Sequence, residues 1–269
     1  SDIDLLSAAL TLKRSLLPGE FEGRLFYMFY GDDREITKVD NRPAPLREAD
    51  RKSDIDLSTF GLHLIGTREA GPGKADVLFW GALQGGEWGG LRQRSWAWAV
   101  EAGYQLPKLF LRPWLRAGYF AGSGDDNPTD GLHKTFFQMI PTGRPYAQFP
   151  FFNQMNSRDL FVQLLGSWPE RGISVRIDLR RLWLSERDDL WYMGSGATQR
   201  GGVLSGYVGR PSRGSRDLAT LADISLSYDL SKLLNVNLYY GHAFGGGVVS
   251  RIYSEDDGDF AYLELQFKF

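Results

Sequence analysis

Residues 96–104 read Trp-Ala-Trp-Ala-Val-Glu-Ala-Gly-Tyr, and large apolar side chains occupy every second position except 102, where the residue is alanine. In a β-strand, successive side chains point to opposite faces. Trp96, Trp98, Val100 and Tyr104 therefore share one face, and Glu101 lies on the other. Residues 173–179 and 261–269 alternate in the same way. The pattern predicts antiparallel β-structure with one apolar face and one polar face.

Eleven segments of this kind follow one another along the chain, and we expect a strand in each. Their approximate ranges are 5–15, 21–31, 54–67, 75–85, 93–105, 109–121, 159–168, 172–184, 217–229, 235–245 and 260–269. Short links at 16–20, 69–74, 106–108, 169–171 and 230–234 alternate with longer polar links near 32–53, 86–92, 122–158, 185–216 and 246–259. No linker interrupts this order, so we expect residues 1–269 to form a single domain.

Alternation alone also fits a soluble β-sandwich, but three features favour a transmembrane β-barrel. Tryptophan and tyrosine lie near the ends of predicted strands, where barrels carry an interfacial girdle. The links alternate in length, as the turns and external loops of outer-membrane barrels do. The last strand ends in Phe269, a pattern similar to the signal that the barrel assembly machinery recognises. We therefore expect an all-β barrel in a bacterial outer membrane, with lipid around it and the assembly machinery as a partner through Phe269.

The composition excludes several other classes of protein. Lys and Arg total 31 against 33 Asp and Glu, so the chain lacks the basic excess of a nucleic-acid binder. The absence of Cys excludes disulfides and thiolate metal sites, and nothing in the sequence implies a cofactor. No apolar run reaches the roughly 18 residues of a transmembrane helix. The three histidines lack a serine nucleophile motif, so we expect no catalysis, and an outer-membrane lipid hydrolase is the least favoured alternative.

The number of strands predicts that the chain is the C-terminal part of a longer barrel. If the last strand ends in the periplasm, the first of the eleven begins outside the cell. A bacterial barrel normally has an even number of strands and starts in the periplasm. An odd number of further strands is then needed. We expect an open sheet, in which the first and last strands do not pair with each other.

Six short segments in the second half of the chain occur in a recognisable order. They are Ala-Gly-Ser-Gly-Asp-Asp at 121–126, Phe-Phe-Gln-Met-Ile-Pro-Thr-Gly at 136–143, Asn-Ser-Arg-Asp-Leu at 156–160, Asp-Asp-Leu-Trp-Tyr at 188–192, Gly-Tyr-Val-Gly-Arg at 206–210 and Gly-Gly-Gly at 245–247. From about Trp114 to Phe269 the chain thus resembles the alginate export family of outer-membrane channels. The resemblance implies a barrel of about 18 strands, about seven more than the predicted eleven. It also implies an anion-selective, arginine-lined lumen partly covered by loops. It leaves the substrate and any periplasmic export partner open.

Arginines on the polar faces form the candidate site. Arg112 and Arg116 lie four residues apart in one predicted strand, as do Arg176 and Arg180 in another. Residues four apart in a strand share a face. An arginine facing lipid at the bilayer midplane would cost about 2–4 kcal/mol, so we expect all four to point into the lumen. Guanidinium groups there would attract carboxylates or phosphates.

Three further residues bear on this site. Arg24 is also expected to face the lumen, and Glu101 and Asp178 are expected beside the arginines as lumenal acids. The sequence therefore predicts a channel that passes an anionic saccharide such as alginate, or a small organic anion, by diffusion. Two alternatives remain open. Arginine–acid pairs could serve only to stiffen the wall, and the barrel could be structural or adhesive.

The long link 122–158 contains Phe136, Phe137, Tyr146, Phe149, Phe151 and Phe152. This is too apolar for a loop surrounded by water, so we expect it to pack against the barrel rim or to fold into the pore. The long links also contain acidic clusters at 125–126, 188–189 and 256–259. None has the ligand spacing of a calcium loop, and we expect solvated carboxylates there.

Overall fold

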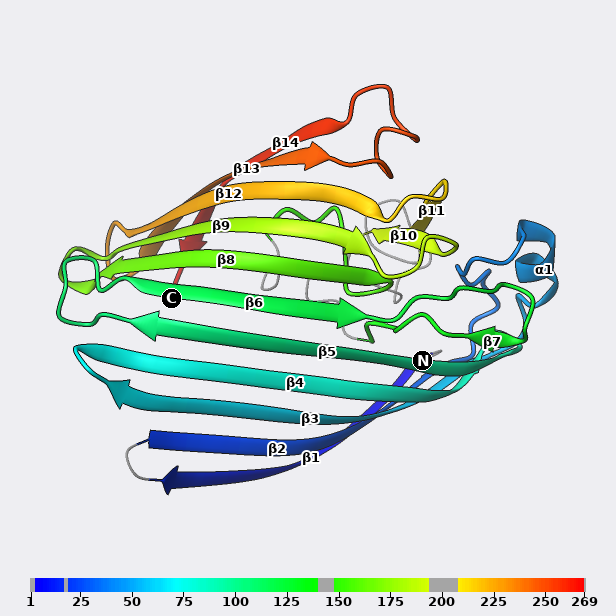
Figure 1. The fold of residues 1–269 in the computed structure, drawn as a ribbon, viewed down its shortest axis with the longest axis horizontal. Helices are drawn as coiled ribbons and strands as arrows, with labels where there is room; N and C mark the ends of the chain where they lie inside the picture. Colours follow the sequence, from blue (N-terminus) through cyan, green and yellow to red (C-terminus); the bar gives the residue numbers. More distant parts are fainter. Residues whose placement is uncertain (1–2, 17–18, 140–147, 194–207, 269) are drawn as a thin grey trace.

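The computed structural model describes residues 3–16, 19–139, 148–193 and 208–268. Eleven long strands follow one another in a single antiparallel sheet (Figure 1). They are β1 (Ile3–Leu16), β2 (Gly19–Asp32), β3 (Ile55–Ala70), β4 (Gly73–Trp88), β5 (Leu91–Gln105), β6 (Trp114–Gly122), β8 (Ser157–Trp168), β9 (Ile173–Leu184), β12 (Asp217–Asp229), β13 (Leu234–Gly245) and β14 (Asp257–Phe267). Each predicted segment overlaps one of these strands. The predicted antiparallel all-β fold is confirmed.

The links contain the remaining regular structure. The elements are α1 (Ala44–Ala49), β7 (Leu132–His133), the short helix η1 (Pro169–Arg171), β10 (Leu190–Met193) and β11 (Val208–Pro211). Strand β7 pairs in parallel with the start of β5, while β10 and β11 pair with each other in a separate small sheet. All of these except η1 lie at one end of the long strands, called the loop end below (Figure 1). The opposite end is called the turn end.

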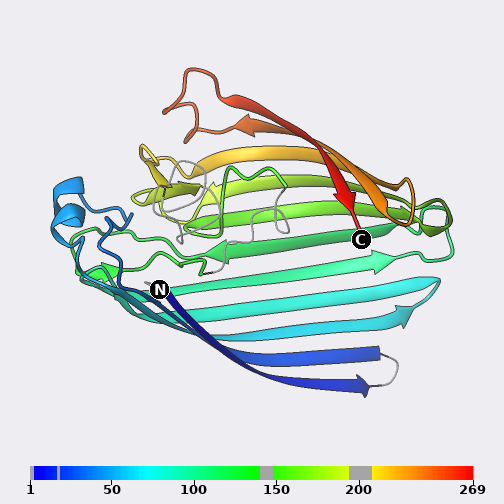
Figure 2. The ribbon, with the colours of Figure 1, turned by 180° about the vertical axis from the view of Figure 1, so that it is seen from behind.

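The sheet is a curved wall with β1 at one edge and β14 at the other (Figures 1 and 2). Backbone pairing runs as an open path between these two strands, and no ladder among the described residues joins them. Phe269, the expected contact of the assembly machinery, lies outside the described residues.

The prediction of a long polar link at 86–92 is wrong. Strand β4 continues to Trp88 and β5 begins at Leu91, so only Gly89 and Gly90 form the turn. Their φ angles are 50° and 83°, which glycine adopts without steric cost. Two residues with positive φ match the twist of a tight hairpin. The glycine-rich sequence 85–90 resembles a loop in composition but forms the end of a hairpin.

The predicted strand at 109–121 begins five residues too early, and the short link 106–108 is correspondingly longer. Leu111 and Arg112 have φ angles of 61° and 42°, which interrupt a β-strand. The Leu106 N–H donates to the Pro113 carbonyl at 2.8 Å and closes this turn. Strand β6 starts only after Pro113, whose fixed φ suits a turn exit. Arg112 therefore lies in a turn and not on the strand of Arg116.

The two faces of the sheet differ in chemistry. One face, called the outer face, exposes large apolar side chains, including Leu10 (72%), Leu83 (67%) and Phe60 (63%). An apolar surface this continuous needs an apolar environment. The inner face contains the charged residues in the middle of the strands, whereas Arg94, Arg158 and Arg181, near the loop end, lie on the outer face. At the loop end, the long links cover the inner face. The alternation of the strands thus separates a lipid-type surface from a polar one, as the sequence predicts.

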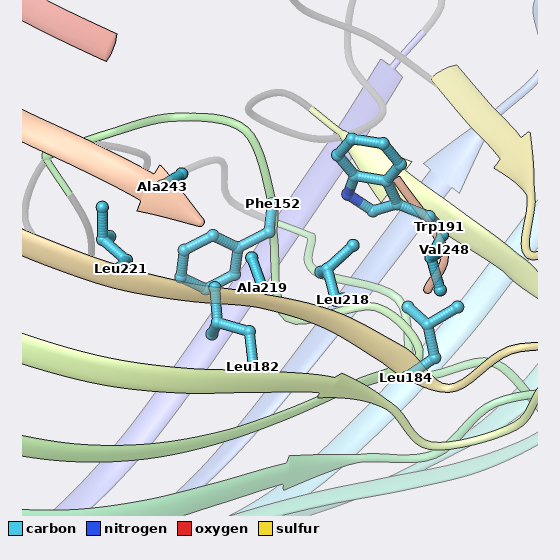
Figure 3. Close-up of a cluster of buried hydrophobic side chains, with 9 residues drawn as sticks. All are labelled: Phe152, Leu182, Leu184, Trp191, Leu218, Ala219, Leu221, Ala243 and Val248. Carbon is cyan, nitrogen blue, oxygen red and sulfur yellow. The ribbon is translucent and has the colours of Figure 1, made fainter. Parts of the chain in front are cut away.

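The inner face is packed where the links cover it. One cluster of buried side chains joins β9, β12 and β13 to the links that cross them (Figure 3). Its members are Phe152, Leu182, Leu184, Trp191, Leu218, Ala219, Leu221, Ala243 and Val248. Phe152 of the long link 123–156 lies among the strand residues Leu182, Ala219 and Leu221 (Figure 3). The link is therefore part of the folded interior.

Candidate functional site

A row of polar side chains crosses the inner face through neighbouring strands. Arg116 on β6 is opposite Gln163 on β8, which is opposite Asp178 on β9, which is opposite Asp223 on β12. Directly opposed residues in antiparallel strands have Cβ atoms about 4.5–5.5 Å apart. Strand register therefore places all four side chains in reach of a neighbour. The row lies between the packed loop end and the turn end.

Hydrogen bonds connect this row. The Arg116 guanidinium pairs with Glu101 on β5 and donates to Gln163 Oε1 at 3.1 Å. Gln163 Nε2 donates to Asp178 Oδ1 at 2.7 Å. Asp178 also forms an ion pair with the Arg176 guanidinium. One continuous network thus joins β5, β6, β8 and β9 through their inner side chains.

Arg180 lies one step nearer to the loop end. It pairs with Asp159 on β8 and lies 3.6 Å from Asp178. Arg180 is 3% exposed and Asp159 is 0% exposed. A buried charge requires a paired and hydrogen-bonded partner. Arg180 is therefore enclosed in the wall, and the expectation that it lines an open lumen does not fit its burial.

The described arginines of the network differ in how much they present to the inner space. The side chains of Arg116 and Arg176 are 21% and 20% exposed, whereas Asp178 and Asp159 are fully covered. Counting Asp223, the network has three guanidinium groups and four carboxylates, so its total charge is not positive. Because Arg116 and Arg176 are more exposed than Asp178 and Asp159, the part of the network that faces the inner space is richer in guanidinium groups than the total charge of the network suggests.

Arg112 and Arg24 lie apart from this network. Arg112 is in the 106–113 turn and pairs with Glu170 at 2.7 Å. Arg24 is on β2, where it bonds to Thr11 and Glu22 at 3.1 Å each. Arg24 shares the inner face of β2 with Glu22, and Arg112 lines the cavity described below. The four arginines predicted to point into the lumen therefore do not form one regular patch, because Arg112 is in a turn and Arg180 is enclosed.

A cavity of about 530 Å³ lies on the inner face toward the turn end. Arg112 and Arg176 both line it, as does Glu264 on β14. The rest of its lining is rich in hydroxyl and amide side chains, namely Ser167, Ser174, Ser225, Ser227, Asn235, Asn237, Gln105, Gln148 and Gln266. These groups both donate and accept hydrogen bonds. The cavity is a polar surface with two cationic groups, suited to a hydrated or hydroxylated solute.

The long link folds inward at the loop end. Gln84 on β4 forms two hydrogen bonds with the Phe137 backbone, from Nε2 to the carbonyl and from the N–H to Oε1, each of 2.8 Å. Gln93 on β5 donates to the Thr135 carbonyl at 3.0 Å. The Phe137 ring packs 5.0 Å from Trp88. The described part of link 122–158 is thus docked on the inner face, while Tyr146 lies outside the described residues.

His133 is completely buried in this docked segment. Its ring stacks on Trp88 at 4.4 Å, and Nδ1 is 2.6 Å from Gln93 Oε1. Because Gln93 Nε2 already donates to Ser95 and Thr135, its Oε1 faces the histidine as an acceptor. Nδ1 therefore carries the proton, and the ring is neutral. Burial lowers the pKa of His133 to about 4.

The expectation of solvated loop acids is wrong for Asp125 and Asp189. Both are buried, at 0% and 1% exposure. The Asp189 carboxylate accepts from the Asp125 N–H at 3.0 Å, the Thr135 hydroxyl at 2.6 Å and the Tyr192 hydroxyl at 2.9 Å. Burial raises the pKa of Asp189 to about 7 and that of Asp125 to about 6. Asp189 joins the docked link to β10, a role that composition does not reveal.

Several residues of the site were not singled out from the sequence. Asp159 and Gln163 lie four residues apart in the predicted strand 159–168 and share the inner face of β8, so strand alternation contains the signal for them. Gln84 and Gln93 are also on inner positions, at either side of the hairpin that resembled a loop. Their partners include backbone groups of Phe137 and Thr135 in a distant link, and alternation contains no information about those.

Comparison with known proteins adds the family. The family described as "Alginate export" matches residues 11–259. The chain belongs to the alginate export family. The match begins far before Trp114, so the N-terminal strands belong to it as well, although the sequence resemblance was apparent there in strand pattern only.

Membership of an export family fits transport rather than an enzyme, and with the all-β sheet it suggests an outer-membrane protein. No curated protein matches this alginate export family member. One similar solved structure is described as "Unveiling the Mechanism Behind the in-meso Crystallization of Membrane Proteins". It is 8% identical in sequence, the alignment covers 97% of this chain and 81% of the solved chain, and the TM-score is 0.32. Among the described residues, no helix has the length and apolar character needed to cross a membrane.

Proposed function

We propose that this chain forms the wall of a bacterial outer-membrane channel that passes an anionic solute, such as the acidic polysaccharide alginate, by diffusion along an arginine-bearing inner face. Its family supports the transport of alginate. The observation that carries the anionic preference is the difference in exposure between Arg176 and Asp178. Asp178 is covered, whereas Arg176 lines the cavity toward the turn end.

The arrangement suits transit better than tight binding. Arg176 is already paired with a carboxylate, and Arg112 with Glu170, so each offers only part of its hydrogen-bonding capacity to a solute. A solute carboxylate would form weak contacts that break again, as conduction requires. The surrounding hydroxyl and amide groups could replace the water of a sugar chain. The acids hold the guanidinium groups in place.

The outer face supports the membrane location. Its large exposed apolar residues would face the hydrocarbon core, with outer-membrane lipid as the partner. In this orientation the long links lie outside the cell and the short turns face the periplasm. Phe269 would serve the assembly machinery, and periplasmic export proteins would approach from the turn end. A purely structural or adhesive barrel would not need a polar inner cavity.

The test is the ion selectivity of the reconstituted protein in planar bilayers. We expect anions to be preferred, and Arg112→Ala combined with Arg176→Ala to lower the anion-to-cation permeability ratio. Arg94→Ala is a matched control, because Arg94 is exposed on the outer face. An unchanged ratio in the double variant, or a cation preference in the unaltered protein, would show that the arginines serve only to hold the wall together.

A further inference from the structure

Two arginines lie on the outer face near the loop end. Arg158 on β8 and Arg181 on β9 each adjoin a residue of the buried inner pair Asp159–Arg180, so alternation directs them outward. Trp183 is directly opposite Arg158 in the ladder, and Leu160 is opposite Arg181. Arg158 and Arg181 are therefore diagonal neighbours with Trp183 next to both. Diagonal positions are about 7–8 Å apart, within reach of long side chains.

The two guanidinium groups differ in their partners. Arg181 donates to Asp217 at 2.5 Å and to Thr220 at 2.9 Å, and it lies 5.6 Å from the Trp183 ring centre. No hydrogen bond or ion pair connects the side chain of Arg158 with another described residue. Its Nε is buried and lacks an acceptor within the part of the chain that the structure describes. This cluster of two arginines and one aspartate has a net positive charge centred on Arg158.

An unpartnered, half-buried guanidinium is costly on a membrane-facing surface. Burying a charged group without a partner is unfavourable, and near the interface an arginine is tolerated because it reaches the headgroup layer. The guanidinium fork matches phosphate oxygens in geometry and charge. An indole ring beside it suits the boundary between headgroups and acyl chains. The ion pair of Arg181 with Asp217 holds the second arginine against Trp183 and limits their freedom.

We propose that Arg158, with Trp183 and Arg181 beside it, forms a binding site for the phosphate group of a membrane lipid at the loop end of the outer face. The ligand is a lipid phosphomonoester, whose phosphate contacts Arg158 while its apolar part lies along the outer face below. The acyl chains, which would lie against the apolar outer face, distinguish this ligand from free phosphate. The site rests on the membrane orientation proposed above but not on conduction or solute choice.

The experiment is a titration of the folded protein in detergent with diphosphoryl lipid A, with bound lipid counted by native mass spectrometry. We expect Arg158→Gln to weaken binding about tenfold, because a charge-assisted hydrogen bond is lost. Arg158→Lys retains the charge and should recover part of the affinity, which also separates a binding defect from a folding defect. Arg94→Gln is the matched control, since Arg94 is exposed on the same face two strands away. It should bind as the unaltered protein does.

Three outcomes would overturn the site. Arg158→Gln could bind lipid A as tightly as the unaltered protein. Arg94→Gln could lose as much affinity as Arg158→Gln, which would indicate diffuse attraction to a basic rim. Inorganic phosphate at the lipid concentration could displace the lipid, which would indicate an anion site without lipid specificity. The lipid titration does not depend on bilayer conductance, so failure of the channel proposal and failure of the lipid-site proposal can be distinguished.

Discussion

Arg180 and Asp159 form an ion pair between two neighbouring strands on the inner face, and both side chains are almost completely buried. Breaking such a pair by removing one partner leaves a buried charge and typically costs about 3–5 kcal/mol. The pair lies where the packed loop end of the sheet meets the polar wall. It holds β8 to β9 at that level, and Arg180 thus serves the structure of the wall.

Replacement of Asp159 tests this structural role. We expect Asp159→Ala to lower the free energy of unfolding by about 3 kcal/mol. This is the lower end of the usual cost, because Asp178, 3.6 Å from Arg180, still offsets part of the buried charge. The measurement is reversible urea unfolding in lipid or detergent, followed by tryptophan fluorescence. Arg94→Ala, an exposed substitution, should change stability by about 0.5 kcal/mol or less. A similar small change in Asp159→Ala would mean that the pair contributes little.

The strand residues of the wall could be predicted from the sequence, because alternation determines which face each side chain occupies. Arg176, Asp178 and Arg180 were placed on one face correctly for this reason. Glu101 and Asp178 were expected beside the arginines, but which acid pairs with which arginine depends on strand register and could not be predicted. Arg112 was misplaced because Leu111 and Arg112 have positive φ without being glycine, and such positions have no reliable sequence signal.

The loop end was less predictable than the wall. The aromatic content of the long link indicated packing, and the described residues confirm it. The buried state of Asp125 and Asp189 was not foreseen, because an acidic pair in a polar link resembles a solvated surface. Only the tertiary arrangement brings the Thr135 and Tyr192 hydroxyls to Asp189. Contacts between links distant in sequence leave no periodic pattern.

The docked link should restrict the pore. Gln84→Ala removes both hydrogen bonds to the Phe137 backbone, each worth about 0.5–1.5 kcal/mol, and so weakens docking. We expect larger and more frequent open levels in single-channel recordings, and a still larger conductance when the link 123–156 is deleted. Thr67→Ala, at the turn end of β3, is a control that should leave conductance unchanged. Equal conductance in the deletion and in the unaltered protein would show that the link lies beside the permeation path.

Docking of the link should also depend on pH. The pKa of Asp189 is raised from 3.8 to about 7 by burial, so the docked state binds more protons than the released state between these values. Its stability therefore falls as pH rises from about 4 to about 7. One pKa unit corresponds to about 1.4 kcal/mol. We expect hydrogen-exchange protection of the Phe137 amide, relative to an unstructured peptide, to fall at least about tenfold between pH 5 and pH 8.

The matched variant is Asp189→Asn, which resembles the protonated acid. Two opposing contributions then remain. The raised pKa of Asp125 favours docking at low pH, whereas the lowered pKa of His133, about 4, favours docking at high pH. Because these nearly cancel, protection in Asp189→Asn should vary little between pH 5 and pH 8. A slope as steep as that of the unaltered protein would place the titration elsewhere.

Gln163 offers a way to change the charge of the inner wall without removing an arginine. Its amide accepts from Arg116 at 3.1 Å and donates to Asp178 at 2.7 Å, and the side chain is buried. Gln163→Glu keeps the shape and the contact with Arg116 but replaces the donor to Asp178 with a second negative charge. Two adjacent carboxylates repel each other, and the added charge offsets the guanidinium of Arg116. We expect the anion preference in planar bilayers to fall.

Gln163→Met separates charge from hydrogen bonding, since it has similar volume, no charge and neither bond. Loss of two buried hydrogen bonds should lower the free energy of unfolding by about 1–3 kcal/mol, because Asp178 and Arg116 each lose a partner. The selectivity should remain near that of the unaltered protein, because the charges on the wall are the same. If Gln163→Met shifts the permeability ratio as strongly as Gln163→Glu, then the geometry of the network, and not its charge, determines which ions pass.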